Sequence, residues 1–278
     1  MFDPERQQQE RKDLAKALRD LRRASGLSGD RLAARCAMSQ SKISRIESGK
    51  VLPSIVDVQR ILAALGVAND AAKPFLDLAR VANVHYRSVR SLAEMGIWRG
   101  QEELGALVES ASTIRYFTPA APSGLLQTAD YARAILTPTI SGRPARNVDR
   151  AVEARLKRQQ ALHDRSRRFI FIMTEQTVRW RQAPAEVMSA QCHHMAELAE
   201  LPNVTIAVVP NDAEMDCGVP LNSFTAYDER FVLVELFSGE MMLRDPRDVE
   251  YHLNIMNHFL ERALVGAEVT ALLRRIEF

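Results

Sequence analysis

The segment from Ser28 to Glu47 constrains the fold more than any other part of this 278-residue chain. Ser28 and Ser39 can each cap the start of a helix, because a serine hydroxyl accepts a hydrogen bond from a free N–H of the first turn. Ala33 is small enough for two helices to cross closely, and Met38 can plug the turn between them. The segment therefore predicts two short helices that cross through a tight turn.

Apolar residues at helical spacing predict three further helices around this pair. Leucines recur at i, i+4 and i+7 from Leu14 and form one face of a helix that ends near Gly26. Ser54 can cap a fourth helix, and a fifth covers about residues 70–83. We therefore expect an all-α N-terminal domain of five helices over residues 10–83.

A family likeness in this domain is carried by Leu32-Ala33, Met38-Ser39-Gln40, Ile43-Ser44, Arg45 to Lys50 and Pro53. These residues resemble the helix-turn-helix domain of the XRE family of bacterial regulators, which is similar to the phage Cro-type repressors. By that resemblance, the second helix of the pair enters the major groove of double-stranded DNA. The resemblance implies a sequence-specific transcriptional regulator that binds DNA half-sites as a homodimer.

The same resemblance implies roles for individual side chains. Base edges would be contacted by Gln40, Ser41 and Lys42, since glutamine can pair with adenine and lysine can reach guanine. Phosphate contacts, which fix the register on DNA, would come from Ser39, Ser44, Arg45 and Lys50.

Two positions depart from the family's pattern. Gly29 stands where the family commonly has a glutamine that clamps a phosphate, which puts that contact in doubt. Ala37 stands where the family commonly has glycine in a left-handed conformation. Keeping that conformation would cost about 1 kcal/mol with alanine, so we expect a slightly altered turn.

The sequence pattern changes beyond the N-terminal domain. Helical patterns occur at about 126–136, 145–163, 184–200 and 246–264. Between them lie β-branched or aromatic runs at 169–173, 204–209, 224–227 and 231–237, with a short one at 240–244. Close spacing of the last three runs predicts antiparallel hairpins. We expect a helical connector over 84–104 and an α+β domain over 105–278, with a short helix near 267–275.

A second likeness is carried by residues 124–133, 155–160, Glu175, 201–204 and 208–210. They resemble the uncharacterised C-terminal domain that follows the helix-turn-helix in WhiJ-like regulators of actinobacteria. The resemblance implies a domain that receives a signal and supports dimerisation, the signal being a small-molecule effector or a small partner protein encoded nearby. If this domain has a pocket, its candidate ligand-binding residues are Gln127, Tyr131, Arg155 and Glu175.

Charge is divided unevenly along the chain. Residues 1–90 contain 17 Lys or Arg and 10 Asp or Glu, whereas the remaining residues contain 20 and 25. A basic N-terminal third beside an acidic remainder fits DNA binding by one domain only. The three cysteines form no disulfide framework, the N-terminus lacks a signal-peptide pattern, and no apolar run reaches about 18 residues. We expect a cytoplasmic protein with no membrane partner.

Catalytic and metal-binding patterns are weak in this sequence. Residues 192–197 place a histidine and a glutamate four apart but lack the HExxH motif, and residues 212–223 only begin like a calcium-binding loop. We therefore expect no enzyme, no metal and no cofactor. An enzyme carrying a DNA-binding domain stays open as an alternative, as does the antitoxin-like or sensor half of a two-gene system that acts through protein–protein binding.

A basic cluster is the strongest polar feature of the second domain. The cluster has three alternative explanations: it binds an anionic ligand, it contacts flanking DNA, or it is an ordinary solvated helix face. Its members are Arg143, Arg146, Arg150, Arg155, Lys157, Arg158, Arg165, Arg167 and Arg168.

Overall fold

The computed structural model describes residues 4–88, 97–137, 147–216 and 218–278. The chain forms two compact units. One consists of residues 1–86 together with 242–246, and the other of residues 87–241 together with 247–278.

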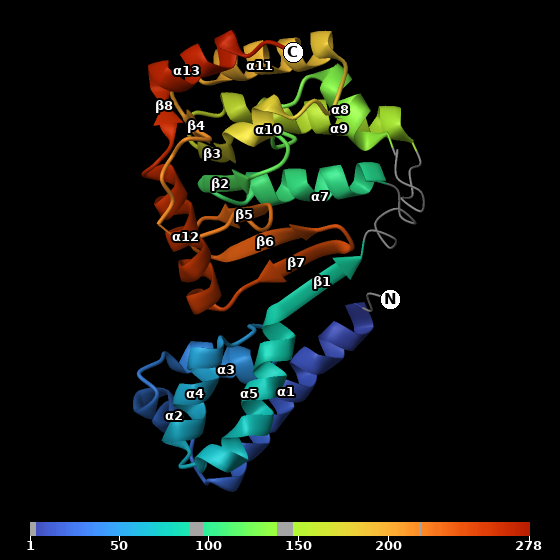
Figure 1. The fold of residues 1–278 in the computed structure, drawn as a ribbon. Helices are drawn as coiled ribbons and strands as arrows, with labels where there is room; N and C mark the ends of the chain where they lie inside the picture. Colours follow the sequence, from blue (N-terminus) through green and yellow to red (C-terminus); the bar gives the residue numbers. More distant parts are fainter. Residues whose placement is uncertain (1–3, 89–96, 138–146, 217) are drawn as a thin grey trace. The chain divides into compact units, whose positions relative to one another are not determined.

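The five helices predicted for the N-terminal domain are all present (Figure 1). They are α1 (Pro4–Ala24), α2 (Gly29–Arg35), α3 (Gln40–Glu47), α4 (Ile55–Ala64) and α5 (Asn69–Asn83). The predicted caps form as well, since the side chains of Ser28, Ser39 and Ser54 each accept a hydrogen bond from the backbone N–H three residues later. Each cap fixes where a helix begins, and with it the direction of the helix.

One apolar core holds these helices together. The most deeply buried side chains include Leu14, Leu18, Leu32, Ile43 and Ile46, none of which is more than 2% exposed. Burying an aliphatic side chain of this kind contributes about 1.5–3 kcal/mol. Because α3 contributes only its inner isoleucines to the core, its opposite side is left for polar residues.

The turn between α2 and α3 corrects one prediction. Ala37 has a φ of +53°, so it keeps the left-handed conformation and the turn is not altered. The backbone N–H of Met38 donates to the carbonyl of Ala33 (3.0 Å), which closes the turn over the partly buried Met38 side chain. The turn geometry is therefore retained at the expense of strain at one alanine.

A short segment from the C-terminal half of the sequence belongs to the N-terminal unit. Residues 242–246 group with residues 1–86. The buried carboxylate of Asp245 accepts a hydrogen bond from the backbone N–H of Ile55, the first residue of α4 (3.3 Å). A carboxylate at this end of a helix is electrostatically favourable.

The second part of the chain contains a mixed sheet with the strand order β1-β7-β6-β5-β2-β3-β4-β8. β2 and β3 pair in parallel, as do β3 and β4, whereas β5 is antiparallel to both β2 and β6. The strands are β1 (Val84–Ser88), β2 (Thr113–Thr118), β3 (Arg168–Thr174), β4 (Val204–Val209), β5 (Phe224–Tyr227), β6 (Phe231–Leu236), β7 (Gly239–Leu243) and β8 (Leu264–Val265).

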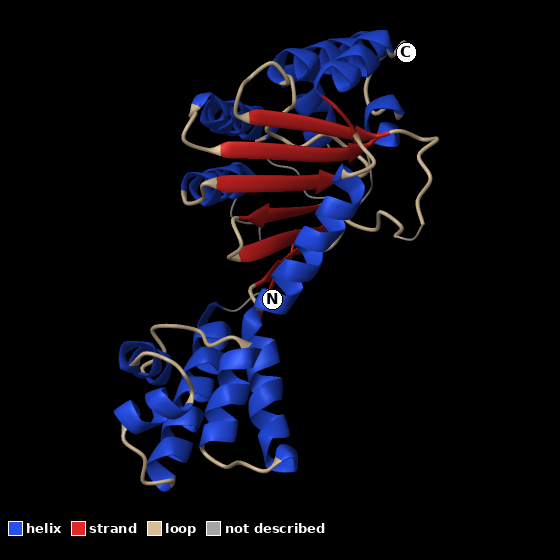
Figure 2. Cartoon of the chain, turned by 90° about the vertical axis from the view of Figure 1, so that its left-hand side faces the viewer, coloured by secondary structure: helices blue, strands red, loops and turns tan. Residues whose placement is uncertain are grey.

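Helices cover this sheet. The chain crosses from β2 to β3 through α8 (Ala129–Leu136), α9 (Val148–Gln159) and the short η1 (Gln160–His163). It crosses from β3 to β4 through α10 (Glu175–Arg179) and α11 (Ala185–Leu198). Towards the C-terminus, α12 (Pro246–Leu260) lies across one face of the sheet (Figure 2), and α13 (Gly266–Arg275) contacts α11 and β4. The α+β prediction is confirmed.

The predicted helical connector over 84–104 is wrong in its first part. Val84–Ser88 forms the strand β1, residues 89–96 lie outside the described residues, and α7 covers Ile97–Glu109. Strand β2 was also missed by the sequence patterns. Its segment, Thr113–Thr118, contains polar residues among the apolar ones, so its strand character depends on pairing with β3 and β5.

The strain at Ala37 gives a prediction. Ala37→Gly removes a left-handed cost of about 1–2 kcal/mol but adds backbone entropy, so we expect a net stabilisation of about 0.5–1 kcal/mol. Residues 1–83 contain no Trp or Tyr, so backbone hydrogen exchange is the suitable measurement. Amides of residues 40–47 should exchange about two- to fivefold more slowly. Ala34→Gly, in the exposed part of α2, is the matched control and should accelerate exchange; a slowing in both variants would contradict the explanation.

Candidate functional site

The outer side of α3 is accessible, as the sequence predicts. Six of the seven predicted DNA-binding residues are exposed, namely Ser39, Gln40, Ser41, Ser44, Arg45 and Lys50. The Ser39 hydroxyl accepts the capping hydrogen bond from the backbone N–H of Lys42 (3.2 Å). The Arg45 Nε donates to the carbonyl of Ser41 (3.3 Å), which keeps the guanidinium group along the exposed side of the helix.

Lys42 is placed differently from the others. Its Nζ forms an ion pair with Oδ1 of Asp57 (2.7 Å), and its side chain is 38% exposed. Asp57 is also part of the capping box of α4, because its other carboxylate oxygen accepts from the backbone N–H of Ser54 (3.2 Å). A base contact by Lys42 would therefore require this ion pair to open, and Lys42 instead links α3 to the start of α4.

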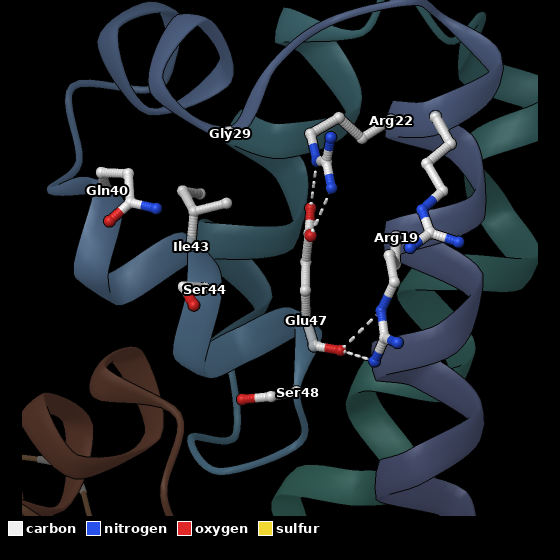
Figure 3. Close-up of a pocket in the computed structure, with 9 residues that line it drawn as sticks. Arg19, Arg22, Gly29, Gln40, Ile43, Ser44, Glu47 and Ser48 are labelled. Carbon is white, nitrogen blue, oxygen red and sulfur yellow. Dashed lines mark hydrogen bonds and ion pairs between the residues drawn. The ribbon is translucent and has the colours of Figure 1, made fainter.

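A hollow of about 380 Å³ lies beside α3 (Figure 3). Side chains from α1 and α3 line it together with Gly29 at the start of α2. The lining residues are Arg19, Arg22, Arg23, Gly29, Gln40, Ile43, Ser44, Glu47 and Ser48. The hollow thus combines three arginines with polar groups of the predicted recognition helix.

Two of these arginines hold Glu47, the last residue of α3. The Nε and Nη2 of Arg22 donate to the two carboxylate oxygens of Glu47 (2.6 and 2.8 Å), and the Nε of Arg19 donates to its backbone carbonyl (3.0 Å) (Figure 3). The hydrogen bond from Arg22 to Glu47 raises the pKa of the guanidinium group, although desolvation opposes it. This arrangement makes Glu47 a buried structural residue.

Arg23 is the third arginine of the hollow, and its side chain is exposed. Among the described residues it has neither a hydrogen-bond nor an ion-pair partner. It lies by the same hollow as Gly29, the position at which the XRE resemblance predicts the loss of one phosphate contact. Sequence reasoning overlooked these arginines, yet their spacing of three and four residues along α1 does place them on one side of a helix.

In the C-terminal domain, the structure brings together two of the four predicted ligand-binding residues by a direct hydrogen bond. Arg155 donates through Nη1 to the Oε1 of Gln127, and both side chains are buried. Tyr131 is also buried and donates from its hydroxyl to the Oε1 of Gln182 (2.7 Å). Burial raises the pKa of Tyr131, and the charge of Arg155 acts in the opposite direction.

Glu175 lies in a different environment. Its carboxylate accepts hydrogen bonds from the backbone N–H of Asn211 (2.7 Å) and from the Nε of Arg179. Burial acts to raise the pKa of Glu175, but these two donors outweigh it and the pKa is lowered. The carboxylate therefore ties the end of β3 to the loop after β4, and its hydrogen bonds do not join it to the pair of Gln127 and Arg155.

The basic cluster is not a single surface. Arg143 and Arg146 lie outside the described residues. Arg150 lies over the ring of Trp98, with its Cζ 3.4 Å from the ring centroid. Arg167 pairs with Asp164, whereas Arg165 and Arg168 are exposed. Lys157 is exposed, whereas the side chains of Arg155 and Arg158 both lie against Gly124 in the loop after β2.

No grouping of side chains in the described part of the chain is suited to hold a metal ion. Burial lowers the pKa of His194 in α11, while the neighbouring Glu197 acts against this. The buried Cys36 and Cys192 are free thiols, and Cys217 lies outside the described residues. None of the described helices has the length and apolar character that crossing a membrane requires.

Comparison with protein families agrees with this division. A model described as a helix-turn-helix domain matches residues 13–74, which confirms the prediction for the N-terminal domain. A model described as a domain of unknown function, DUF5753, matches residues 101–275 and so covers more than half of the chain. The chain belongs to the DUF5753 family. No curated protein matches it.

Solved structures give only distant similarity to this DUF5753 protein. Nuc, a phospholipase D family member from Salmonella typhimurium, has 11% identity and a TM-score of 0.34, covering 60% of this chain and 90% of that chain. NucT from Helicobacter pylori has 11% identity and a TM-score of 0.38, covering 66% and 98%. The archaeal chromatin protein TrmBL2 has 14% identity and a TM-score of 0.33, covering 74% and 65%. Scores this low support no argument about function.

The contacts of Glu47 give a second prediction. Glu47→Gln keeps the shape of the side chain but removes the charge that faces Arg22, so we expect a loss of about 1–3 kcal/mol in the stability of the N-terminal domain. Amides of residues 40–47 should then exchange hydrogen about five- to 150-fold faster. Asp77→Asn makes the same chemical change in the exposed ion pair with Arg80 and should change exchange little. Equal effects of the two substitutions would refute the anchoring role.

Proposed function

We propose that this DUF5753 protein is a sequence-specific DNA-binding transcriptional regulator of the XRE type. The observation that carries the proposal is the geometry of α3. Its isoleucines are buried, its end is anchored by Arg22, and its outer side presents exposed polar residues. A helix of this kind, which follows a tight turn and is rigidly held, suits the major groove of DNA.

Within this proposal the residues of α3 have separate roles. Gln40 lies exposed at the first position of the helix, where side chains of recognition helices contact base edges. Arg45 and Lys50 supply charge for phosphates. Arg23 adds a cation beside the hollow at Gly29, and we propose that it takes over the contact to phosphate that the absent glutamine would make.

We further propose that the C-terminal domain receives a signal, as in WhiJ-like regulators, and that the protein acts by binding rather than by catalysis. Support comes from residues 242–246, which link β7 to α12 in sequence and yet belong to the N-terminal unit. Asp245 in this segment holds the first N–H of α4. A change in the strand that precedes Asp245 can therefore be passed through the chain to the helices around α3.

A single small helix-turn-helix makes few contacts with DNA, so we propose that the protein binds as a homodimer to two half-sites about one DNA turn apart. A small partner protein remains the alternative source of the signal. Several large apolar side chains of the C-terminal domain are exposed and available to such a partner, among them Leu221, Phe237 and Tyr251.

The test is selection of binding sites from a random duplex DNA pool with the full-length protein, followed by affinity measurements on the selected site at several salt concentrations. Gln40→Ala should lower discrimination at one base position by about 1–3 kcal/mol. Arg45→Ala should weaken selected and unselected duplexes alike and reduce the salt slope by about one.

Lys73→Ala is the matched control for Arg45. Lys73 is an exposed residue of α5 that forms an exposed ion pair with Asp70, so its removal deletes one positive charge away from α3. Recovery of no enriched sequence from the pool would reject the proposal. An equal reduction of the salt slope by Lys73→Ala and Arg45→Ala would reject α3 as the DNA-binding surface.

A further inference from the structure

One face of the C-terminal sheet brings together polar side chains that are distant in sequence. The register from β2 through β5 into β6 places Tyr116, Tyr227 and Glu235 on the same face, because alternate residues of a strand point the same way. Phe117 points to the opposite face, where its ring packs against Phe259 of α12 (4.6 Å between centroids). The face that carries the two tyrosines is thus the one away from α12.

Two arginines of α9 act on this polar face. Burial raises the pKa of both Tyr116 and Tyr227, and the charge of Arg158 acts against that increase at each hydroxyl. Burial and the charge of Glu240 raise the pKa of Glu235, while Arg155 and Arg158 lower it. Both guanidinium groups are therefore within electrostatic reach of the carboxylate on β6.

The loop that follows β2 is shaped to admit these arginines. A Cβ atom at Gly124 would lie 2.7 Å from Nη2 of Arg158 and 3.2 Å from Nε of Arg155. The side-chain amide of Gln159 donates to the Gly124 carbonyl (2.9 Å), which fixes the loop on α9. Glycine is needed here for close approach, and its φ lies outside the left-handed range.

The guanidinium groups of Arg155 and Arg158 differ in the hydrogen-bond acceptors that the protein gives them. Arg155 donates to Gln127 and, through Nε, to Gln101 of α7 (3.3 Å). Arg158 forms no hydrogen bond or ion pair with any described residue, and its Nε is buried. Arg158 as a whole is half-buried, and its Nε is withdrawn from water without the acceptor that a buried donor normally has. Its guanidinium group is thus available to an added ligand.

We propose that Arg158, supported by Arg155, binds the carboxylate or phosphate group of a small organic molecule between α9 and the face of β2, β5 and β6. Planar guanidinium groups suit both anions, which they can bind through two parallel hydrogen bonds. Glu235 lies on the same face, and although the surrounding protein raises its pKa, its side chain still reaches solvent. Its carboxylate accepts a hydrogen bond from a donor group of the same molecule. The regulatory meaning of this site rests on the proposed function, whereas the binding itself does not.

The experiment measures thermal unfolding of the full-length protein with inorganic phosphate, phenyl phosphate or benzoate, each titrated at constant ionic strength against NaCl. These probes separate a free phosphate ion, an organic phosphate and an organic carboxylate. At least one should raise the unfolding midpoint of the wild type in a saturable way. Arg158→Gln should raise the probe concentration needed for the same shift about tenfold or more.

Two further variants make the result specific to this site. Arg165→Gln removes the same charge at an exposed position, so it should respond like the wild type. It also controls for anions that bind the basic N-terminal domain or that stabilise proteins generally. Gly124→Ala places a methyl group against Nη2 of Arg158 and Nε of Arg155, so it should weaken binding as Arg158→Gln does.

The absence of a saturable shift with all three probes would overturn the proposal. Equal shifts in the wild type, Arg158→Gln and Gly124→Ala would overturn it as well, because the anion would then act elsewhere. Since no DNA is present, these outcomes are independent of site selection by α3. Failure of the anion-binding test therefore leaves the proposed DNA binding by α3 unaffected, and the reverse is also true.

Discussion

The bidentate contact between Arg22 and Glu47 is the interaction on which the candidate DNA-binding surface depends. Arg22 also donates to the carbonyl of Leu27 (2.9 Å), so one side chain of α1 fixes both the entry to α2 and the end of α3. Arg19 adds a contact to the Glu47 carbonyl. A recognition helix of eight residues is too short to be stable alone, and these contacts, together with its buried isoleucines, hold it in one orientation.

Two carboxylates fix the start of α4, the helix that follows α3. Lys42 pairs with Asp57 at the start of α4, and Asp245 holds the first N–H of that helix. Both carboxylates lie where the positive end of α4 favours negative charge. The position of α4 therefore depends on one residue of the predicted reading helix and on one residue that follows β7 in sequence.

The sequence predicted what depends on local chemistry. Caps at Ser28, Ser39 and Ser54, the apolar faces of the first five helices and the strands β3 to β7 all formed as expected, because each carries its signal in residues a few positions apart. Long-range contacts were not predictable in this way. β2 is a strand because β3 and β5 pair with it. Lys42 forms an ion pair with Asp57, and the Glu175 carboxylate accepts a hydrogen bond from the backbone N–H of Asn211. Of the candidate ligand residues, Gln127 and Arg155 meet. The basic cluster had already included Arg158, whereas nothing local marked Glu235 as their companion.

Arg22 and Arg158 differ in whether the protein itself supplies acceptors for their buried N–H groups. Arg22 is largely withdrawn from water, but each nitrogen of its guanidinium group donates to Glu47 or Leu27, so its charge stabilises the fold. Arg158 is placed against the Gly124 backbone with a buried Nε that has no acceptor among the described residues. Desolvating a charge without a partner is unfavourable, and a fold keeps such a group only where another benefit offsets the loss. Binding an anion supplies that benefit, because the partner that Arg158 lacks within the protein is then provided by the ligand.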